Sequence, residues 1–115
     1  MKTYQGKCHC GAVRFEVDTD LASSFRCNCT FCVRRGATMQ KVPEAQFHLL
    51  SGESDLSKYG GRDFSKHFFC SKCGINCFTR LDWNNQKSVA VNVGCLEGAN
   101  LDALQPSLFD GLNKL

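Results

Sequence analysis

The stretch Cys27-Asn28-Cys29-Thr30-Phe31-Cys32 places three thiols within six residues, and two further cysteine groups accompany it in the chain. Cys8-His9-Cys10 lies near the start, and Cys70-Ser71-Lys72-Cys73 lies in the second half. Cysteines two or three positions apart can direct their sulfur atoms to one tetrahedral ion, and Zn²⁺ is the metal most often bound by such sulfur sets. We therefore interpret the three groups as metal ligands that determine the fold.

A disulfide framework is the alternative interpretation of a chain with nine cysteines. An odd number leaves at least one thiol unpaired, and cysteines at positions i and i+2 fit the narrow geometry of a disulfide poorly. No apolar run of signal-peptide length follows Met1, so we expect a cytoplasmic location. Clustered cysteines in that compartment bind metal or take part in catalysis more often than they form disulfides. These arguments favour metal sites.

The composition fits one small domain over residues 1–115. Hydrophobic residues make up 43% of the chain, which provides a modest core that bound metal would help to stabilise. The net charge is only +3 and the basic residues form no concentrated stripe, so nucleic acid is not an expected partner. No stretch approaches ~18 apolar residues, so no membrane span is expected either. The sequence leaves the oligomeric state open.

Alternating apolar and polar residues predict β-strands in much of the chain. The clearest alternation covers residues 12–17, and valines at positions 89, 91 and 93 repeat with the same period. A short helix over residues 30–35 would place Cys29 and Cys32 on one side. The other candidates are strands over 25–27, 38–42, 46–50 and 77–81 and a helical turn within 99–104. The prediction is a mainly β fold of antiparallel sheets with short helical turns.

The first and third cysteine groups together could supply the four sulfurs of a closed metal site. Cys8 and Cys10 would be completed by Cys70 and Cys73, and a glycine follows each pair directly. Glycine allows the backbone to turn tightly beside an ion and to point N–H groups at the sulfurs. Because a site with four protein ligands has no open position, we expect it to clamp the N-terminal strand to a distant hairpin.

The middle group differs because Cys27, Cys29 and Cys32 have no obvious local fourth ligand. An open position is typical of catalytic or exchangeable metal sites. Three thiolates make Zn²⁺ a weak Lewis acid towards water but leave it suited to a soft ligand such as an incoming thiol. We therefore expect a thiol substrate at this site.

Two cysteines outside the three quoted groups leave a second interpretation open. Cys77 or Cys95 could fill the fourth position beside the middle group, which would make every site structural. Both could instead be buried hydrophobic residues, which is the commoner fate of a free cysteine and is our expectation.

The other polar residues near the cysteine groups have ordinary structural explanations. His9 lies between two candidate ligands and is expected to point away from the ion. His48 and His67 are expected at the surface or in packing contacts, and Arg34 and Arg35 are expected to form a solvated face.

Together, the cysteine groups and their flanking residues resemble the family of glutathione-dependent formaldehyde-activating enzymes, which shares its domain with centromere protein V. The resemblance runs from about Gly6 to about Gly111, and it is specific because the order and spacing of all three groups match. The matching motifs are KCHCGAVRF at 7–15, CNCTFCVRR at 27–35, FCSKCG at 69–74 and VNVGCL at 91–96.

The resemblance implies a β-tent-like fold built around two Zn²⁺ ions. It implies a structural zinc on the four cysteines of the first and third groups, and a second, catalytic zinc on Cys27, Cys29 and Cys32. It also implies a carbon–sulfur lyase-type activity in which formaldehyde and glutathione, or a related thiol, combine to S-hydroxymethylglutathione or a similar adduct.

Several functional details stay open in the sequence. The carboxylates of glutathione could bind to Arg34, Arg35, Arg62 or Lys66, and the sequence does not distinguish among them. The alternative to an enzyme is a non-enzymatic, zinc-stabilised module that binds a partner or senses thiols or metal.

Overall fold

A computed structural model describes residues 1–60 and 62–114, which form ten β-strands, two short α-helices and four 3₁₀ turns. The strands are β1 (Lys2–Lys7), β2 (Arg14–Thr19), β3 (Phe25–Cys27), β4 (Met39–Pro43), β5 (Phe47–Ser51), β6 (Leu56–Tyr59), β7 (Ser65–Cys70), β8 (Asn76–Trp83), β9 (Gln86–Asn92) and β10 (Ser107–Phe109). The helices are α1 (Thr30–Arg35) and α2 (Gly111–Lys114). The 3₁₀ turns are Glu44–Gln46, Glu53–Asp55, Val93–Cys95 and Leu101–Ala103.

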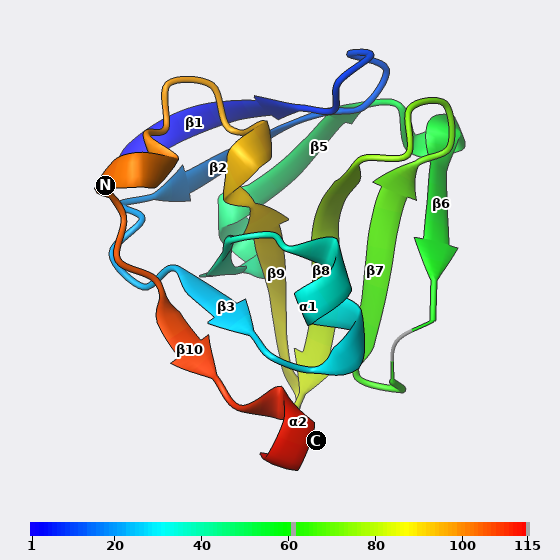
Figure 1. Cartoon of the computed structure of the whole chain (residues 1–115). Coiled ribbons are helices and arrows are strands. Elements are labelled where there is room, and N and C mark those ends of the chain that lie inside the picture. Colours follow the sequence, from blue (N-terminus) through cyan, green and yellow to red (C-terminus); the bar gives the residue numbers. More distant parts are fainter. Residues whose placement is uncertain (61, 115) are drawn as a thin grey trace.

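The strands form a small sheet of order β1-β2-β5 and a large sheet of order β10-β3-β4-β9-β8-β7-β6 (Figure 1). Every pairing within these two sheets is antiparallel except for the parallel pairing of β10 with β3. The small sheet lies across one end of the long central strands, and α1 lies over a face of the large sheet. The predicted mainly β fold with short helices is therefore confirmed.

The structure agrees best with the sequence-based boundaries around the middle cysteine group. β3 and α1 begin and end at the predicted residues, whereas β2, β4, β5, β8 and β9 are shifted by one to three residues. The helical turn expected within 99–104 is the 3₁₀ turn at Leu101–Ala103. β1, β6, β7, β10 and α2 were not predicted, and the parallel partner of β3 was not predicted either.

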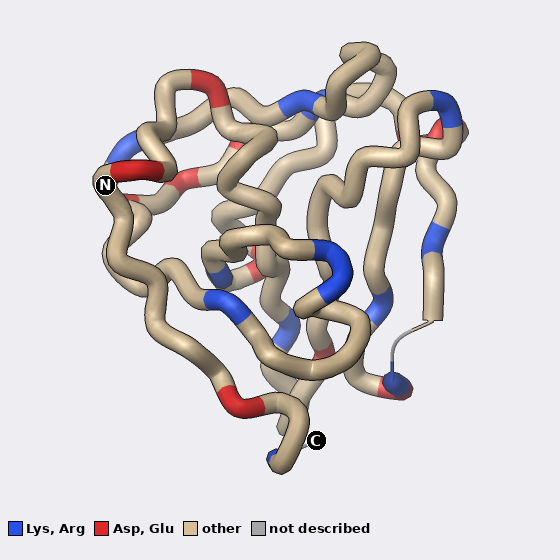
Figure 2. Tube along the Cα trace, viewed as in Figure 1, with Lys and Arg blue, Asp and Glu red and all other residues tan. Residues whose placement is uncertain are grey.

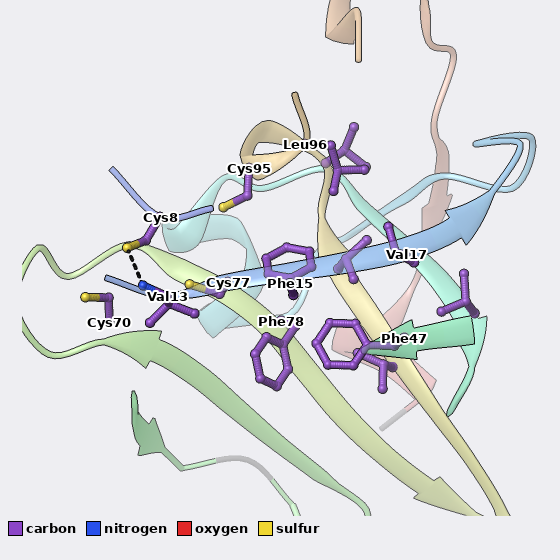
Figure 3. Packing of buried hydrophobic residues seen from close by; sticks show 14 of the residues in the cluster. Cys8, Val13, Phe15, Val17, Phe47, Cys70, Cys77, Phe78, Cys95 and Leu96 are labelled. Carbon is purple, nitrogen blue, oxygen red and sulfur yellow. Dashed lines mark hydrogen bonds between the residues drawn. The ribbon is translucent and has the colours of Figure 1, made fainter. Parts of the chain in front are cut away.

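Aromatic rings join the two sheets into one core (Figure 3). Phe15 of β2, Phe47 of β5 and Phe78 of β8 are all buried, and their ring centroids lie 4.7 to 6.1 Å apart. Phe68 of β7 stacks on Phe78 at 5.2 Å. Burying a side chain of this size stabilises the folded state by ~2–3 kcal/mol, so these contacts are a main source of stability. They leave the opposite face of the large sheet free to form a site.

The two cysteines outside the quoted groups belong to this core. Cys77 is 0% exposed and Cys95 is 7% exposed, and Figure 3 shows both at the end of the core that faces Cys8 and Cys70. The expectation that they are buried apolar residues is confirmed. Among the described residues, no helix combines the length and the apolar character that a membrane crossing requires.

Candidate metal centres and the adjoining cavity

Four cysteines from the two ends of the motif region meet in one cluster. The sulfur atoms of Cys8, Cys10, Cys70 and Cys73 all lie within 4.8 Å of one another. The Sγ–Sγ distance is 3.7 Å both from Cys10 to Cys8 and from Cys10 to Cys70. Two thiolates on a tetrahedral Zn²⁺ with bonds of ~2.3 Å are ~3.8 Å apart, so the spacing of this cluster fits a zinc ion.

Two glycines turn the backbone beside the four-cysteine cluster, but their N–H groups do not donate hydrogen bonds to its sulfurs. Gly11 and Gly74 adopt positive φ angles of 82° and 79°, which suit glycine because it lacks a Cβ. Their N–H groups donate to the carbonyls of Cys8 and Cys70 at 3.2 and 2.7 Å, so the expectation that they point at sulfur is wrong. The N–H of Val13 instead donates to Cys8 Sγ at 3.4 Å.

The four-cysteine cluster is anchored in the fold on both sides. Cys8 directly follows β1 and Cys70 ends β7, and both are essentially fully buried. The turn after Cys70 is fixed to the 3₁₀ turn before β6, because Ser71 donates from its N–H and its hydroxyl to the Asp55 carbonyl at 2.8 Å. An ion held here would join two segments that lie more than sixty residues apart.

The three-cysteine cluster lies where β3 leads into α1. The sulfurs of Cys27, Cys29 and Cys32 lie within 4.8 Å of one another and are all half-buried. Cys29 is the N-cap residue of α1, and its Sγ accepts the Cys32 N–H at 3.4 Å. Cys27 Sγ likewise accepts the Cys29 N–H at 3.5 Å. Three sulfurs with N–H donors form a preorganised ligand set for a soft metal ion.

No fourth cysteine, histidine or carboxylate joins the three-cysteine cluster among residues 1–60 and 62–114. Cys77 and Cys95, the two candidates for that role, lie in the core beside the other cluster. The interpretation in which one of them completes the middle site is therefore not supported.

Arg35 packs against the three-cysteine cluster instead of facing solvent. Its guanidinium donates to Cys32 Sγ at 3.3 Å and to Asn76 Oδ1 at 3.2 Å, and it lies 5.1 Å from the centre of the Phe31 ring. The expectation of a solvated Arg35 is wrong because three positions along a helix place Arg35 on the same side as Cys32. Arg34 is exposed as expected.

The pKa values of the clustered thiols show why each group fits a cation. Backbone donors from Cys10 and Ile75 lower the pKa of Cys73 to about 6. The pKa of Cys10 rises to about 11, because a backbone bond from Ala12 that lowers it is outweighed by desolvation and the neighbouring thiols. Sulfurs this close cannot all carry negative charge without a positive partner.

The three-cysteine cluster likewise contains one thiol whose pKa is lowered and one whose pKa is raised. Burial and the neighbouring Cys29 raise the pKa of Cys32 to about 12, although Arg35 opposes this shift. Burial also raises the pKa of Cys29, but hydrogen bonds from Cys32, Cys27 and Phe31 outweigh it, so the net shift is downward. A divalent ion would allow all three sulfurs to be thiolates at once.

The C-terminal segment fixes the loop between Cys27 and Cys29. The Asn28 side chain donates to Asp110 Oδ1 at 3.0 Å and accepts the Leu112 N–H at 2.9 Å. The Asn28 N–H also donates to the Phe109 carbonyl at 3.2 Å. This contact has no signature in the sequence, since nothing local to Asn28 indicates a partner 82 positions away.

A cavity of about 960 Å³ adjoins the three-cysteine cluster. Its lining includes the three cysteines and residues of β3, β4, β7, β8, β9 and β10. Of the four basic residues considered for substrate carboxylates, Arg35 and Arg62 line it and Arg34 and Lys66 do not.

His67 is a polar group of this cavity as well as the packing residue that was expected. Its ring stacks on Phe31 at 4.3 Å, and its Nδ1 lies 2.8 Å from Thr79 Oγ1. Burial, together with the charge of Arg35, lowers the pKa of His67 to about 4. The imidazole is therefore neutral at pH 7.

The fold and its sites define a class: small β proteins with a four-cysteine and a three-cysteine cluster, the second opening on a cavity. Residues 3–109 match the family model described as glutathione-dependent formaldehyde-activating enzyme, and the chain belongs to this family. It is also similar to the crystal structure of a Rhodobacter sphaeroides protein from a structural genomics programme. The two are 36% identical with a TM-score of 0.82, over 91% of this chain and 99% of the other.

Proposed function

We propose that this protein is a zinc-dependent carbon–sulfur lyase-type enzyme that interconverts formaldehyde plus a thiol, glutathione or a related one, and the S-hydroxymethyl adduct. The observation that carries the proposal is the three-cysteine cluster, which has no fourth ligand among the described residues and faces a cavity large enough for a small molecule. Membership of a family named for glutathione and formaldehyde supports the choice of reaction.

The two cysteine clusters would have different roles. Cys8, Cys10, Cys70 and Cys73 would hold a structural zinc, and Cys27, Cys29 and Cys32 would hold a catalytic one. Zn²⁺ bound at the second cluster would keep the thiol of the substrate as a nucleophilic thiolate at neutral pH. Arg35 would partly neutralise the charge on Cys32 Sγ through its hydrogen bond and hold that ligand in place.

The reaction needs one further group that stabilises the developing charge on the oxygen of formaldehyde. A carbon–sulfur bond forms as the C=O double bond of formaldehyde opens, and the oxygen must then gain a proton. His67 is the imidazole that lines this cavity, and it is neutral. When Thr79 donates its hydroxyl hydrogen to Nδ1, Nε2 carries the ring hydrogen and can donate a hydrogen bond to that oxygen, while the proton that the thiol releases on binding returns to the oxygen through solvent. In the reverse direction the same N–H would stabilise the oxygen as solvent removes its proton.

The direct test measures adduct formation by the zinc-loaded protein, corrected for the spontaneous reaction of formaldehyde with the thiol. We expect a rate above the spontaneous one that depends on protein concentration, about two zinc ions per chain, and loss of the added rate in Cys29→Ser. A folded protein that adds nothing to the rate for any thiol would contradict the proposal and favour the non-enzymatic module.

A spectroscopic test separates thiol binding from turnover. Cobalt in the three-cysteine cluster would report an incoming thiol through its visible absorption, because another sulfur ligand changes the coordination sphere. An unchanged spectrum at saturating thiol would contradict the proposed role of the cluster even if the fold and the metal content were as expected.

A further inference from the structure

The cavity beside the three-cysteine cluster is formed by the face of the large sheet that points away from the core. Thr79, Leu81 and Trp83 of β8 line it at every second position, whereas Phe78, which points to the other face of the strand, lies in the core. Ser65 and His67 of β7 alternate in the same way. Because successive side chains of a strand point to opposite faces, this surface is a continuous floor that extends well beyond the cysteines. Its volume of about 960 Å³ is at the upper end for a small-molecule site.

The cavity is rich in aromatic side chains. Six of its lining residues are Phe, Tyr or Trp, namely Phe25, Phe31, Tyr59, Phe64, Trp83 and Phe109. Trp83 is 57% exposed and meets the Phe64 ring edge to face at 4.9 Å, so a large apolar surface there lacks a partner among residues 1–60 and 62–114. Aromatic surface of this kind gains most from an apolar or aromatic ligand group.

Apart from the three cysteines, the charged side chains that line the cavity have one sign. Four lining residues are basic (Arg35, Lys41, Arg62 and Lys114), and none of the described lining residues is acidic. Figure 2 shows basic positions on α1 and on the strands near it. The carboxylate of Asp110, which lies close by in the chain, is engaged by Asn28 and Asn113. A ligand anion would therefore find basic partners here, whereas no carboxylate among the described lining residues is available to a ligand ammonium group.

Glutathione matches this surface only in part. It carries two carboxylates that basic residues could bind, but it also carries an ammonium group and has no large apolar group. Its ammonium would lose water without gaining a carboxylate, and its polar peptide body would lie against aromatic rings.

We propose that the natural substrate of this cavity is a thiol, or the aldehyde adduct of a thiol, that carries an aromatic ring and a carboxylate but no ammonium group. This inference rests on the thiol-binding role proposed above for Cys27, Cys29 and Cys32, and it replaces glutathione by a thiol of different chemistry. The sulfur would lie at the cysteines, the ring on the aromatic floor and the carboxylate near the basic rim.

Matched thiols test each part of this assignment on the zinc-loaded full chain and its cobalt-substituted form. 2-Mercapto-3-phenylpropanoate and 2-mercaptopropanoate differ by the phenyl ring alone, and 2-phenylethanethiol keeps the ring but lacks the carboxylate. We expect 2-mercapto-3-phenylpropanoate to bind at least about tenfold more tightly than either of the others and than glutathione, by calorimetry and by the cobalt spectrum. Equal affinities, or tighter binding of glutathione, would overturn the inference.

Two variants locate the selectivity. Trp83→Ala should remove most of the affinity that the phenyl ring adds and leave the affinity for 2-mercaptopropanoate unchanged. The control is Leu50→Ala on β5, which also truncates an exposed hydrophobic side chain. Lys41→Gln should weaken the binding of the two thiols that carry a carboxylate severalfold and leave the binding of 2-phenylethanethiol unchanged. The control is Lys58→Gln on β6, because Lys58 does not line the cavity. Unchanged selectivity in both variants would place the ligand elsewhere and overturn the inference.

The outcomes also separate this inference from the proposed function. A cobalt spectrum that responds to glutathione as strongly as to the aromatic thiol leaves the function intact and refutes only the substrate class. A spectrum that no thiol changes refutes the function of the cluster and this inference with it.

Discussion

The two cysteine clusters use the same ligand atom at similar spacing, yet they lie in different surroundings. In the four-cysteine cluster, Cys8 and Cys70 are buried and Cys10 is exposed, and all four sulfurs lie within 4.8 Å of one another. In the three-cysteine cluster every sulfur is half-buried and lies at the wall of a cavity. The two clusters therefore differ in ligand number and in the adjoining cavity and not in the type of ligand, and these are the features that distinguish structural from catalytic zinc sites in general.

Removing a buried sulfur from the four-cysteine cluster should have the largest effect. We expect Cys70→Ser to lose one equivalent of zinc and at least about 3 kcal/mol of the free energy of unfolding, because the metal links segments that otherwise separate. Metal analysis and urea denaturation followed by circular dichroism measure both quantities. Cys95→Ala is the control, since it removes a buried thiol outside the clusters. Equal stability of the two variants would show that the cluster is not structural.

The equivalent change in the three-cysteine cluster should affect binding and spare the fold. Serine is a good N-cap residue, so Cys29→Ser can still accept a hydrogen bond at the start of α1. Its free energy of unfolding should therefore stay within about 1 kcal/mol of that of the unsubstituted protein. We expect it to lose the second zinc and to bind thiols at least about 100-fold more weakly. Thiol titrations and thermal denaturation provide the readouts. If Cys29→Ser unfolds, the three-cysteine cluster supports the fold as the four-cysteine cluster does, and the expected difference between them is wrong.

Arg35 should affect the three-cysteine cluster alone. Arg35→Met keeps an extended side chain but removes the donors to Cys32 Sγ and Asn76, so the affinity for the second zinc should fall by about 10- to 100-fold. Competition with a chromophoric chelator measures this affinity. Arg34→Met, one position away on the exposed side of α1, should change neither metal site. Weakening of the four-cysteine cluster by Arg35→Met would mean that the two sites are coupled.

The smallest expected effect is the pH dependence of stability that His67 contributes beside the second cluster. The unfolded chain binds a proton at this side chain near pH 6.5, whereas the folded protein binds it only near pH 4. Between these values the unfolded state holds more protons, so stability falls as the pH is lowered from about 6.5 towards 4. Because the ring is half-exposed, the loss should be on the order of 1 kcal/mol. His67→Gln should lack this part of the pH dependence in urea titrations, while the groups that face His67, including Arg35, are unchanged.

The sequence predicts the ligand sets and the local elements better than it predicts their surroundings. The residues expected to converge do so in both clusters, and α1 has its predicted bounds because its cysteine spacing and its C-terminal glycine are local signals. β6 and β7 were missed because their side chains are mostly half-exposed and show no clean alternation. The position of Arg35 depends on Phe31 and Asn76, and the cavity depends on the pairing of seven strands, so neither has a signature in a short window.

The long sequence separation between Asn28 and Asp110 has a consequence for how the protein matures. A growing polypeptide presents Cys27, Cys29 and Cys32 together as soon as residue 32 has been made, so this trio can capture an ion early. The four-cysteine cluster is complete only when Cys73 has been synthesised. Asp110, which anchors Asn28, is synthesised 82 positions after Asn28. The three-cysteine cluster can therefore gather its sulfurs first and receive its final anchor last, with the four-cysteine cluster assembled in between.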